Sequence, residues 1–143
     1  MKILFDTNIL VFIAEGTLSK GNEEKIFEND AEYFYSTASL WELVTKALLG
    51  KIDLKCTIQE FEEEFLKRGY QRIDIKASHV HIIPEVAEVN KDPFDRILVA
   101  QAVVEKLTIC TSDKKIAEFT ERKDNRNDIK CLYLDEKYYI QQK

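Results

Sequence analysis

The sequence predicts an α/β fold of three layers, in which helices cover both faces of a central parallel sheet. Short apolar runs that suit strands alternate with longer amphipathic runs that suit helices, and this alternation is typical of a parallel sheet buried on both faces. The chain has only four glycines and two prolines, which excludes collagen and a small turn-rich β domain. Its 143 residues are expected to form one domain, residues 1–143.

The chain is expected to open with a strand and two helices. Residues 3–5 form an apolar run that is too short for a helix and suits a buried strand. Polar cap residues follow it and begin a helix over residues 9–15. After a loop, residues 22–29 have the pattern of a short amphipathic helix, and we expect Ile26 and Phe27 to face inward.

A strand and two helices are expected in the next part of the chain. The aromatic run over residues 33–35 suits a strand. A Ser-Thr pair then caps a helix over residues 37–49, which Gly50 ends. The helix over residues 57–68 begins with a capping box, because Glu60 lies three residues after a threonine.

The second half of the chain continues the alternation. Residues 72–75 suit a strand, and residues 77–86 are ambiguous between helix and strand. An Asp-Pro pair begins a strong helix over residues 93–106 that is apolar nearly all round, so we expect it to be buried. The remaining expected elements are a strand, a capped helix and a strand, over residues 107–110, 113–119 and 130–134.

Two aspartates follow expected strands directly. Asp6 follows the first strand, and Asp113 follows the strand that ends at Cys110. Ligands of open parallel sheets bind beyond the carboxyl ends of the strands, so the two carboxylates can meet in one crevice. Each aspartate also suits the role of a helix N-cap, and this alternative stays open for each of them.

Two further acids lie on expected helices. Asp95 shares its helix face with apolar residues, so its carboxylate needs a cation or hydrogen-bond donors to offset its burial. Asp92 suits the N-cap of the same helix, and whether it has a further role stays open. Glu42 points away from an apolar arc around Trp41, so it is also compatible with a surface glutamate paired with Lys46 four residues later.

Taken in order, these motifs resemble a known family. They are the strand that leads into Asp6-Thr7-Asn8, the run from Ala38 to Leu43 around Trp41-Glu42, the run from Asp92 through Asp95 to Ala102, and Thr111-Ser112-Asp113. Together they are similar to a PIN-domain ribonuclease of the VapC toxin type, over residues 1–119. No departure from the family pattern removes one of the four acids.

The resemblance implies a function and a site. It implies a metal-dependent endoribonuclease that hydrolyses phosphodiester bonds in RNA, with the acids Asp6, Glu42, Asp95 and Asp113 as catalytic and metal-binding residues. Thr7, Asn8 and Ser112 match positions that orient the acids or a metal-bound water. Oxygen ligands suit Mg²⁺ or Mn²⁺ rather than zinc. We expect Asp6 and Asp95 to bind the ion directly. Asp113 is expected to bind it either directly or through another group that contacts the ion, and Glu42 is expected to hold a metal-bound water.

The resemblance also implies partners. Many such proteins are toxins that a small antitoxin silences, and many form homodimers. We therefore expect an RNA substrate, a cognate antitoxin and a homodimer. Separately, short amphipathic helices predict exposed apolar surface for such contacts near Phe12, Ile26, Phe61 and Phe65. The alternative is a catalytically inactive PIN-like module that binds RNA or protein. A haloacid-dehalogenase-like phosphatase is disfavoured, because Asn8 stands where its second acid is needed.

Composition sets limits on these partners. The net charge of −5 excludes a strongly basic nucleic-acid binder, although a local basic patch remains possible. Lysines and arginines near the acids in sequence are candidates for such a patch: Lys46, Lys91, Arg96, Lys114 and Lys115, with a second run at Arg122, Lys123, Arg126 and Lys130. The two histidines, His79 and His81, are expected to be partly exposed. Three widely spaced cysteines and the absence of a long apolar segment predict a cytoplasmic protein with no membrane span.

Overall fold

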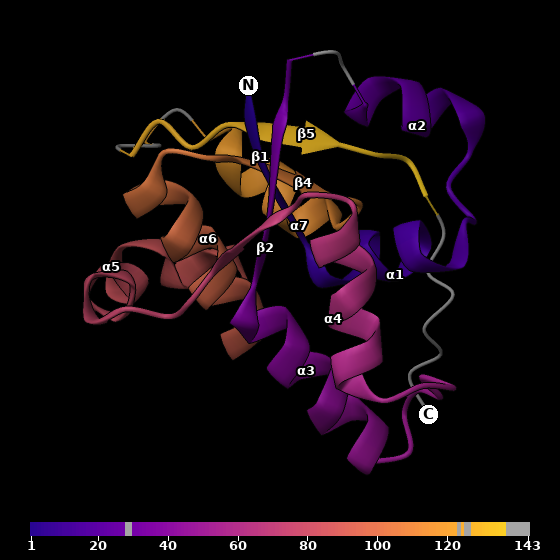
Figure 1. Cartoon of the computed structure of the whole chain (residues 1–143). Helices are drawn as coiled ribbons and strands as arrows, with labels where there is room; N and C mark the ends of the chain where they lie inside the picture. The colour runs from indigo at the N-terminus through magenta and orange to yellow at the C-terminus, as the bar shows by residue number, and fades with distance from the viewer. Residues whose placement is uncertain (28–29, 123, 125–126, 137–143) are drawn as a thin grey trace.

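Five parallel strands form one sheet in the computed structural model (Figure 1). The structure describes residues 1–27, 30–122, 124 and 127–136. The strand order is β3-β2-β1-β4-β5, and every pair of neighbours is parallel. The strands are β1 (Lys2–Phe5), β2 (Glu32–Ser36), β3 (Gln71–Ile73), β4 (Thr108–Thr111) and β5 (Cys131–Tyr133).

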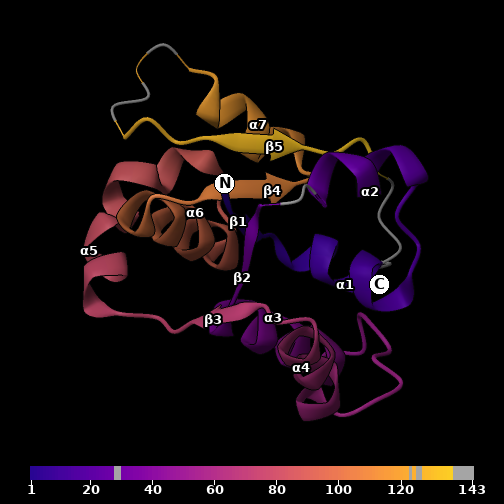
Figure 2. The same cartoon turned by 45° about the horizontal axis from the view of Figure 1, so that its top comes forward.

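Helices cover both faces of this sheet. On one face lie α1 (Thr7–Glu15), α2 (Lys20–Ile26) and α4 (Ile58–Lys67), and on the other lie α5 (Ala77–Val86), α6 (Pro93–Glu105) and α7 (Lys114–Thr120). Figure 2 shows α6 and α1 on opposite sides of β1. The predicted three-layer α/β/α fold with a central parallel sheet is therefore confirmed.

Side chains of single strands alternate between two hydrophobic cores. Ile3 and Phe5 of β1 enter the core beneath α1 and α4, whereas Leu4 enters the core beneath α5 and α6. In β4, Cys110 and Ile109 divide between the cores in the same way. This alternation follows from the two-residue period of a strand, and it explains why the strands are apolar on both faces.

The chain changes direction across the sheet between β1 and β4. From β1 it proceeds outward through β2 to β3, and it then returns to β4 on the other side of β1. A reversal of this kind leaves a crevice at the carboxyl ends of the two central strands. Asp6 follows β1, and Asp113 follows β4 after one further residue, so the fold brings both aspartates to this crevice.

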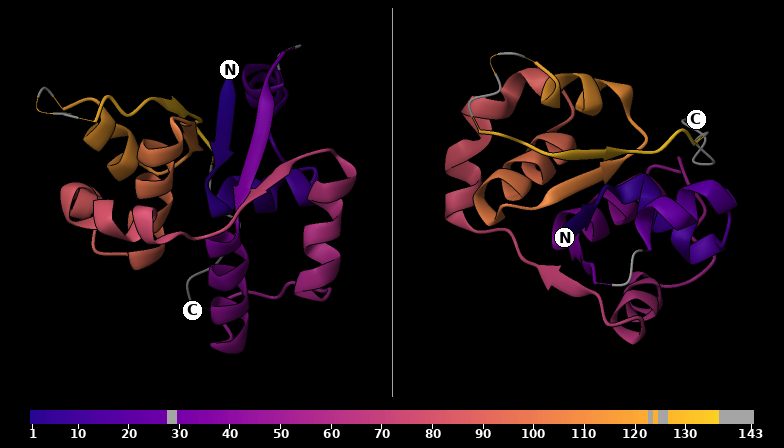
Figure 3. Two further views of the ribbon diagram at one scale, coloured as in Figure 1. Left: turned by 60° about the vertical axis from the view of Figure 1, so that its left-hand side comes forward. Right: turned by 90° about the horizontal axis from the view of Figure 1, so that it is seen from above.

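Helix α3 (Thr37–Leu48) continues from the carboxyl end of β2 and extends beyond the sheet, as the left panel of Figure 3 shows. Its outer side carries the exposed apolar residues Trp41 and Leu48, and Leu49, which caps the end of the helix, is exposed as well. By contrast, the four residues near which we expected exposed apolar surface belong to the core, because the helices α1, α2 and α4 direct them onto the sheet. These are Phe12, Ile26, Phe61 and Phe65, and their assignment as exposed surface was wrong.

Three smaller expectations need correction or completion. Phe27 lies just after α2 and is 42% exposed, so it does not face inward. The ambiguous residues 77–86 form α5, which is followed by the short 3-10 helix η1 (Ala87–Val89). His79 is fully buried between α5 and α6, whereas His81 is exposed. Among the described residues, no helix combines the length and the apolar character needed to cross a membrane.

Candidate functional site

The four predicted acids lie around one pocket at the carboxyl edge of the sheet. The pocket has a volume of about 490 Å³ and is lined by five carboxylates and three lysines. Its lining comprises Asp6, Asn8, Glu42, Lys46, Asn90, Lys91, Asp92, Asp95, Asp113 and Lys115. These residues come from four separate parts of the chain, which only the fold brings together.

Asp6 is held rigidly at the end of β1. Its backbone N–H donates to the carbonyl of Cys110 at 2.9 Å, which continues the pairing of β1 with β4 by one residue. Its carboxylate accepts from the backbone N–H of Thr7 at 2.7 Å and from the hydroxyl of Thr111, also at 2.7 Å. Asp6 is therefore both the N-cap of α1 and a wall of the pocket.

Asp113 is tied to Asp6 through the same threonine. Its backbone N–H donates to Thr111 Oγ1 at 3.0 Å, and its carboxylate accepts from the backbone N–H of Lys115 at 2.8 Å. Asp113 thus caps α7 while it lines the pocket. The cap interpretation and the site interpretation hold together for Asp6 and Asp113, because an N-cap carboxylate has a second oxygen that the cap does not use.

Glu42 is the clearest departure from an ordinary surface residue. It lies on the inner side of α3 and is only 4% exposed. Its Oε2 accepts from Lys46 Nζ, so the predicted i to i+4 pair forms, but it forms inside the pocket. Its Oε1 is buried and has no hydrogen-bond partner among the described residues. A buried carboxylate oxygen without a partner is costly, and a cation or a water would satisfy it.

Asp95 lies in the first turn of α6 and is buried. One carboxylate oxygen accepts from the side-chain amide of Asn90 at 2.6 Å. Asp92 caps the helix by accepting from the backbone N–H of Phe94 at 2.8 Å, and it also lines the pocket. Asp92 is thus held by the first turn of α6, whereas Asp95 is held by Asn90 in the loop that precedes α6.

The acids alter one another's ionisation. Burial, and then the negative charge of Glu42, raise the pKa of Asp6 from 3.8 to about 7, although the Thr111 hydroxyl lowers it. Burial, and then the charge of Asp6, raise the pKa of Asp95 from 3.8 to about 8. Strongly raised carboxyl pKa values in a cleft are typical of functional sites. Burial is the largest cause of both raised pKa values, and the charges of neighbouring acids add to it.

The donor set suits a hard divalent cation. All the acidic groups of the pocket offer oxygen, and the buried Oε1 of Glu42 lacks a partner. Within the described part of the chain, however, no three histidine, cysteine, aspartate or glutamate side chains form a ready-made group of ligands. Asp6, Asp95 and Asp113 each accept a hydrogen bond from a protein donor. An ion bound there would share these carboxylates with their protein donors.

Three supporting residues were not among the predicted site residues. Thr111 joins Asp6 to Asp113, Asn90 holds Asp95, and Ser39 accepts from the hydroxyl of Thr7 at 2.9 Å. Of the small polar residues that were predicted, Asn8 lines the pocket, and the hydroxyl of Ser112 is buried without a partner in the described residues. The sequence did contain a signal for Thr111, because this hydroxyl residue lies two positions before Asp113, an acid that follows a predicted strand.

Only some of the predicted basic residues lie at the acidic pocket. Lys46, Lys91 and Lys115 line the acidic pocket. Lys114 is exposed but is not among the residues that line this pocket. Arg96 instead donates to the backbone carbonyls of Ala87 and Asn90, so its guanidinium holds the loop before α6.

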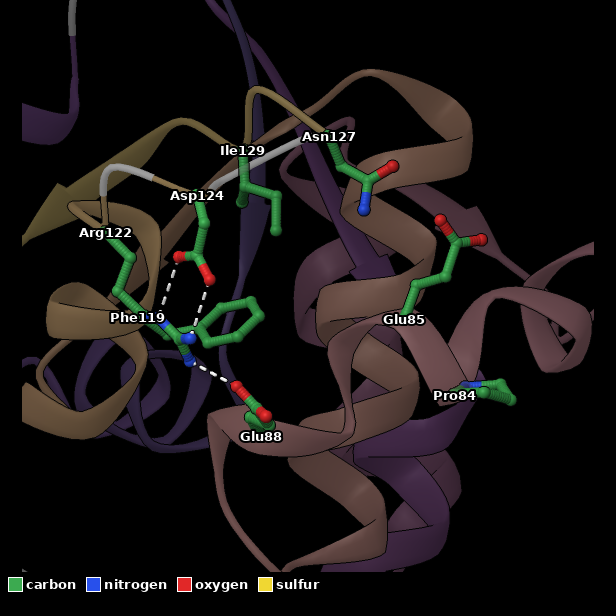
Figure 4. A pocket seen from close by; sticks show the side chains of 8 residues that line it. All are labelled: Pro84, Glu85, Glu88, Phe119, Arg122, Asp124, Asn127 and Ile129. Carbon is green, nitrogen blue, oxygen red and sulfur yellow. Dashed lines mark hydrogen bonds and ion pairs between the residues drawn. The ribbon is translucent and has the colours of Figure 1, made fainter.

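Arg122 also has a structural role. It lies over Phe119 and pairs with Glu88 and Asp124 in a separate cavity of about 240 Å³ (Figure 4). Lys130 is exposed, and the rest of the second basic run, Lys123 and Arg126, lies outside the described residues.

Comparison with known proteins gives a family match. The sequence model of a family described as PIN domain matches residues 3–122. No curated protein matches the chain.

Solved structures are similar in fold across nearly the whole chain. One is VapBC2 from Rickettsia felis bound to a DNA fragment from their promoter, with 21% identity, a TM-score of 0.67 and coverage of 94% of this chain and 100% of that chain. Another is VapBC-1 from nontypeable Haemophilus influenzae, with 15% identity, a TM-score of 0.63 and coverage of 93% and 98%. A third is VapBC-5 from Mycobacterium tuberculosis, a member of the VapBC family of toxin-antitoxin systems, with 13% identity, a TM-score of 0.59 and coverage of 93% and 98%.

Proposed function

The chain belongs to the PIN-domain family, whose members are generally nucleases, and we propose that it is a metal-dependent endoribonuclease that acts as the toxin of a toxin-antitoxin pair. The observation that carries this proposal is the convergence of Asp6, Glu42, Asp95 and Asp113 on one pocket. Four buried or partly buried acids in one pocket are costly to keep unless they bind a cation.

The proposed roles of the residues follow from their contacts. Asp6, Asp95 and Asp113 would hold a Mg²⁺ or Mn²⁺ ion, and Glu42 would offer its free oxygen to the ion or to a water. When bound, the ion neutralises charge on the scissile phosphate and lowers the pKa of the attacking water. Thr111 and Asn90 keep the carboxylates of Asp6 and Asp95 in place for that purpose.

RNA would reach the site along its lysines. Lys91 and Lys115 are exposed at the pocket and can contact backbone phosphates of an RNA bound there. With so few phosphate contacts, we expect modest affinity and a shallow dependence on salt. Selectivity would then come from unpaired and unstacked bases of the RNA.

The proposed partners are an antitoxin and a second copy of the chain. The fold is shared with chains of VapBC assemblies, one of which is described as a member of a toxin-antitoxin family. Exposed Trp41 and Leu48 on α3, with Leu49 at its end, offer apolar surface for such contacts. A basic side chain of the antitoxin, placed among the acids, would complement the charge of the pocket.

A cleavage experiment tests the proposal. Purified wild type and Asp6→Asn are incubated with a structured RNA in Mn²⁺ or in EDTA, and new RNA ends are mapped. We expect cleavage only by wild type and only with the metal, because Asp6→Asn removes a charge while it nearly preserves shape. Equal cleavage by folded wild type and Asp6→Asn would reveal a contaminating nuclease. Absence of cleavage by both, with RNA still bound, would favour the inactive binding module.

A growth experiment tests the toxin role separately. We expect expression of the wild type alone to slow growth, and we expect Asp6→Asn or Asp95→Asn to relieve the arrest at equal protein levels. Growth arrest that is unchanged by both substitutions would contradict the nuclease-toxin proposal.

A further inference from the structure

Lys46 lies within the acidic pocket and pairs with one of its acids. Its side chain is 16% exposed, and its ammonium donates to Glu42 Oε2 at 2.5 Å from one turn further along α3. The other two lysines of the pocket, Lys91 and Lys115, are exposed, and neither forms an ion pair with an acid among the described residues. Lys46 is therefore distinguished from them by both its burial and its contact.

The ion pair with Lys46 satisfies only one of the two carboxylate oxygens of Glu42. Oε2 has the ammonium, whereas Oε1 is buried without a partner in the described residues. Asp6 and Asp95 line the same pocket, and the charge of Glu42 acts on both of them. Lys46 thus supplies the positive charge in contact with Glu42, and the free oxygen remains available to a second cation.

We propose that Lys46 is the resident counter-ion of this pocket, which stabilises Glu42 in the metal-free protein and weakens the binding of a divalent ion beside it. The inference rests on the proposed function, since it requires a metal at the acids. It deepens that function, because it assigns to Lys46 the control of how readily the site takes up its metal.

The physical basis is a competition between two cations for one carboxylate. An ammonium paired with Glu42 lies within a few ångströms of any ion that contacts the same carboxylate, and like charges at such distances repel strongly in a partly buried site. Removing the ammonium also leaves Glu42 as a buried charge with no counter-ion, which destabilises the metal-free fold. Loss of Lys46 should therefore have opposite effects on metal-free stability and on metal affinity.

The test compares Lys46→Met with Lys115→Met. Methionine keeps much of the apolar stem and removes the charge, and Lys115 is a matched control because it lines the same pocket without an ion pair to an acid. Mn²⁺ binding is measured by isothermal titration calorimetry, and melting in EDTA by circular dichroism. We expect Lys46→Met to bind Mn²⁺ about tenfold more tightly and to melt several degrees lower in EDTA. Lys115→Met should change both much less, and Lys46→Arg should resemble wild type.

A double-mutant cycle shows whether the effect passes through Glu42. In a Glu42→Gln background, Lys46→Met should no longer lower the melting temperature in EDTA, because the carboxylate that it neutralised is gone. A loss of stability that persists in that background would overturn the proposal and make Lys46 a packing residue.

The outcomes also separate this inference from the proposed function. If wild type binds Mn²⁺, Asp6→Asn does not, and Lys46→Met has wild-type or weaker affinity, the counter-ion role is overturned and the metal site stands. If wild type binds no Mn²⁺ at all, the counter-ion role and the proposed metal site are overturned together.

Discussion

Thr111 shows how one hydroxyl can organise two acids. It donates its proton to Asp6 and accepts the backbone N–H of Asp113, so it uses both capacities of a hydroxyl group. Its position at the end of β4, beside β1, fixes the relative position of the two acids that follow these strands. The spacing of Asp6 and Asp113 is therefore set by the sheet itself.

Thr111→Val tests this arrangement at nearly constant volume. Valine can make neither hydrogen bond, so we expect the free energy of unfolding to fall by about 1–3 kcal/mol. RNA cleavage should fall as well, because Asp6 and Asp113 lose their common support. Urea unfolding and initial cleavage rates measure the two effects. Thr111→Ser keeps the hydroxyl and should retain most of the cleavage; valine and serine variants of equal activity would contradict this role.

The raised pKa values of Asp6 and Asp95 predict how stability depends on pH. Both groups bind their proton more tightly in the folded state, with pKa values near 7 and 8, than at their ordinary 3.8. Their contribution to stability is therefore fully present below about pH 4 and is lost as the pH rises through 7 and 8. In EDTA, the melting midpoint of the wild type should fall between pH 5 and pH 8, and the midpoint of Asp95→Asn should fall less steeply. Parallel curves for wild type and Asp95→Asn would show that Asp95 does not titrate in this range.

At the scale of elements, local signals predicted more than periodicity did. The capping box that begins α4 and the Asp-Pro start of α6 were both correct, because each depends on a few neighbouring residues. In α3 the apolar arc around Trp41 divides between core and surface, since Leu43 is fully buried whereas Leu48 is 83% exposed. This helix extends beyond the sheet, so no layer covers the outer part of its apolar side, although Leu40 and Leu43 pack in the core beneath α1 and α4. Periodicity identifies an apolar side of a helix but does not indicate what packs against it.

A buried histidine joins α5 to α6 and was not predicted. His79 accepts the backbone N–H of Lys76 through Nδ1 at 3.0 Å, which serves in place of a side-chain N-cap. The ring then carries its proton on Nε2, which lies 2.8 Å from Glu105 Oε2 and donates to it. One side chain thus begins α5 and links it to the end of α6.

His79→Leu removes both of these hydrogen bonds while it keeps an apolar side chain in the core. We expect a loss of about 2–3 kcal/mol in the free energy of unfolding, measured in urea, with an unchanged denaturant slope. The exposed neighbour His81 provides the control, and His81→Leu should change stability by less than about 0.5 kcal/mol. Similar losses for both variants would mean that the buried contacts of His79 contribute little.

At the scale of the whole molecule, the sequence predicted which acids meet but not how they are held. The strand-end rule brought Asp6 and Asp113 together, and burial on α6 pointed to Asp95. Glu42 joined them only through the family resemblance, because nothing in its own helix pattern indicated a buried carboxylate. Their partners Thr111 and Asn90 come from other segments, and such contacts depend on tertiary packing that periodicity does not contain.

The convergence of distant segments predicts that metal binding stabilises the folded chain as a whole. An unfolded chain cannot gather acids from positions 6, 42, 95 and 113, so Mn²⁺ should bind the native state alone. At a free concentration 100 times its dissociation constant the ion would add about 2.7 kcal/mol, which corresponds to a rise of about 5–10 °C in the melting temperature of a chain of this size. Differential scanning calorimetry in Mn²⁺ and in EDTA measures this rise.

Two matched substitutions show which acids produce that rise. Asp113 and Asp92 both cap helices and both line the pocket, and asparagine caps a helix as well as aspartate does. Asp113→Asn and Asp92→Asn therefore remove a charge while they leave the caps intact. We expect Asp113→Asn to lose most of the Mn²⁺-induced rise at the same Mn²⁺ concentration, because it removes a proposed ligand. Asp92→Asn should keep most of the rise, because Asp92 is not one of the four proposed metal ligands. The reverse pattern would move the metal toward the start of α6 and would make Asp92, rather than Asp113, a ligand.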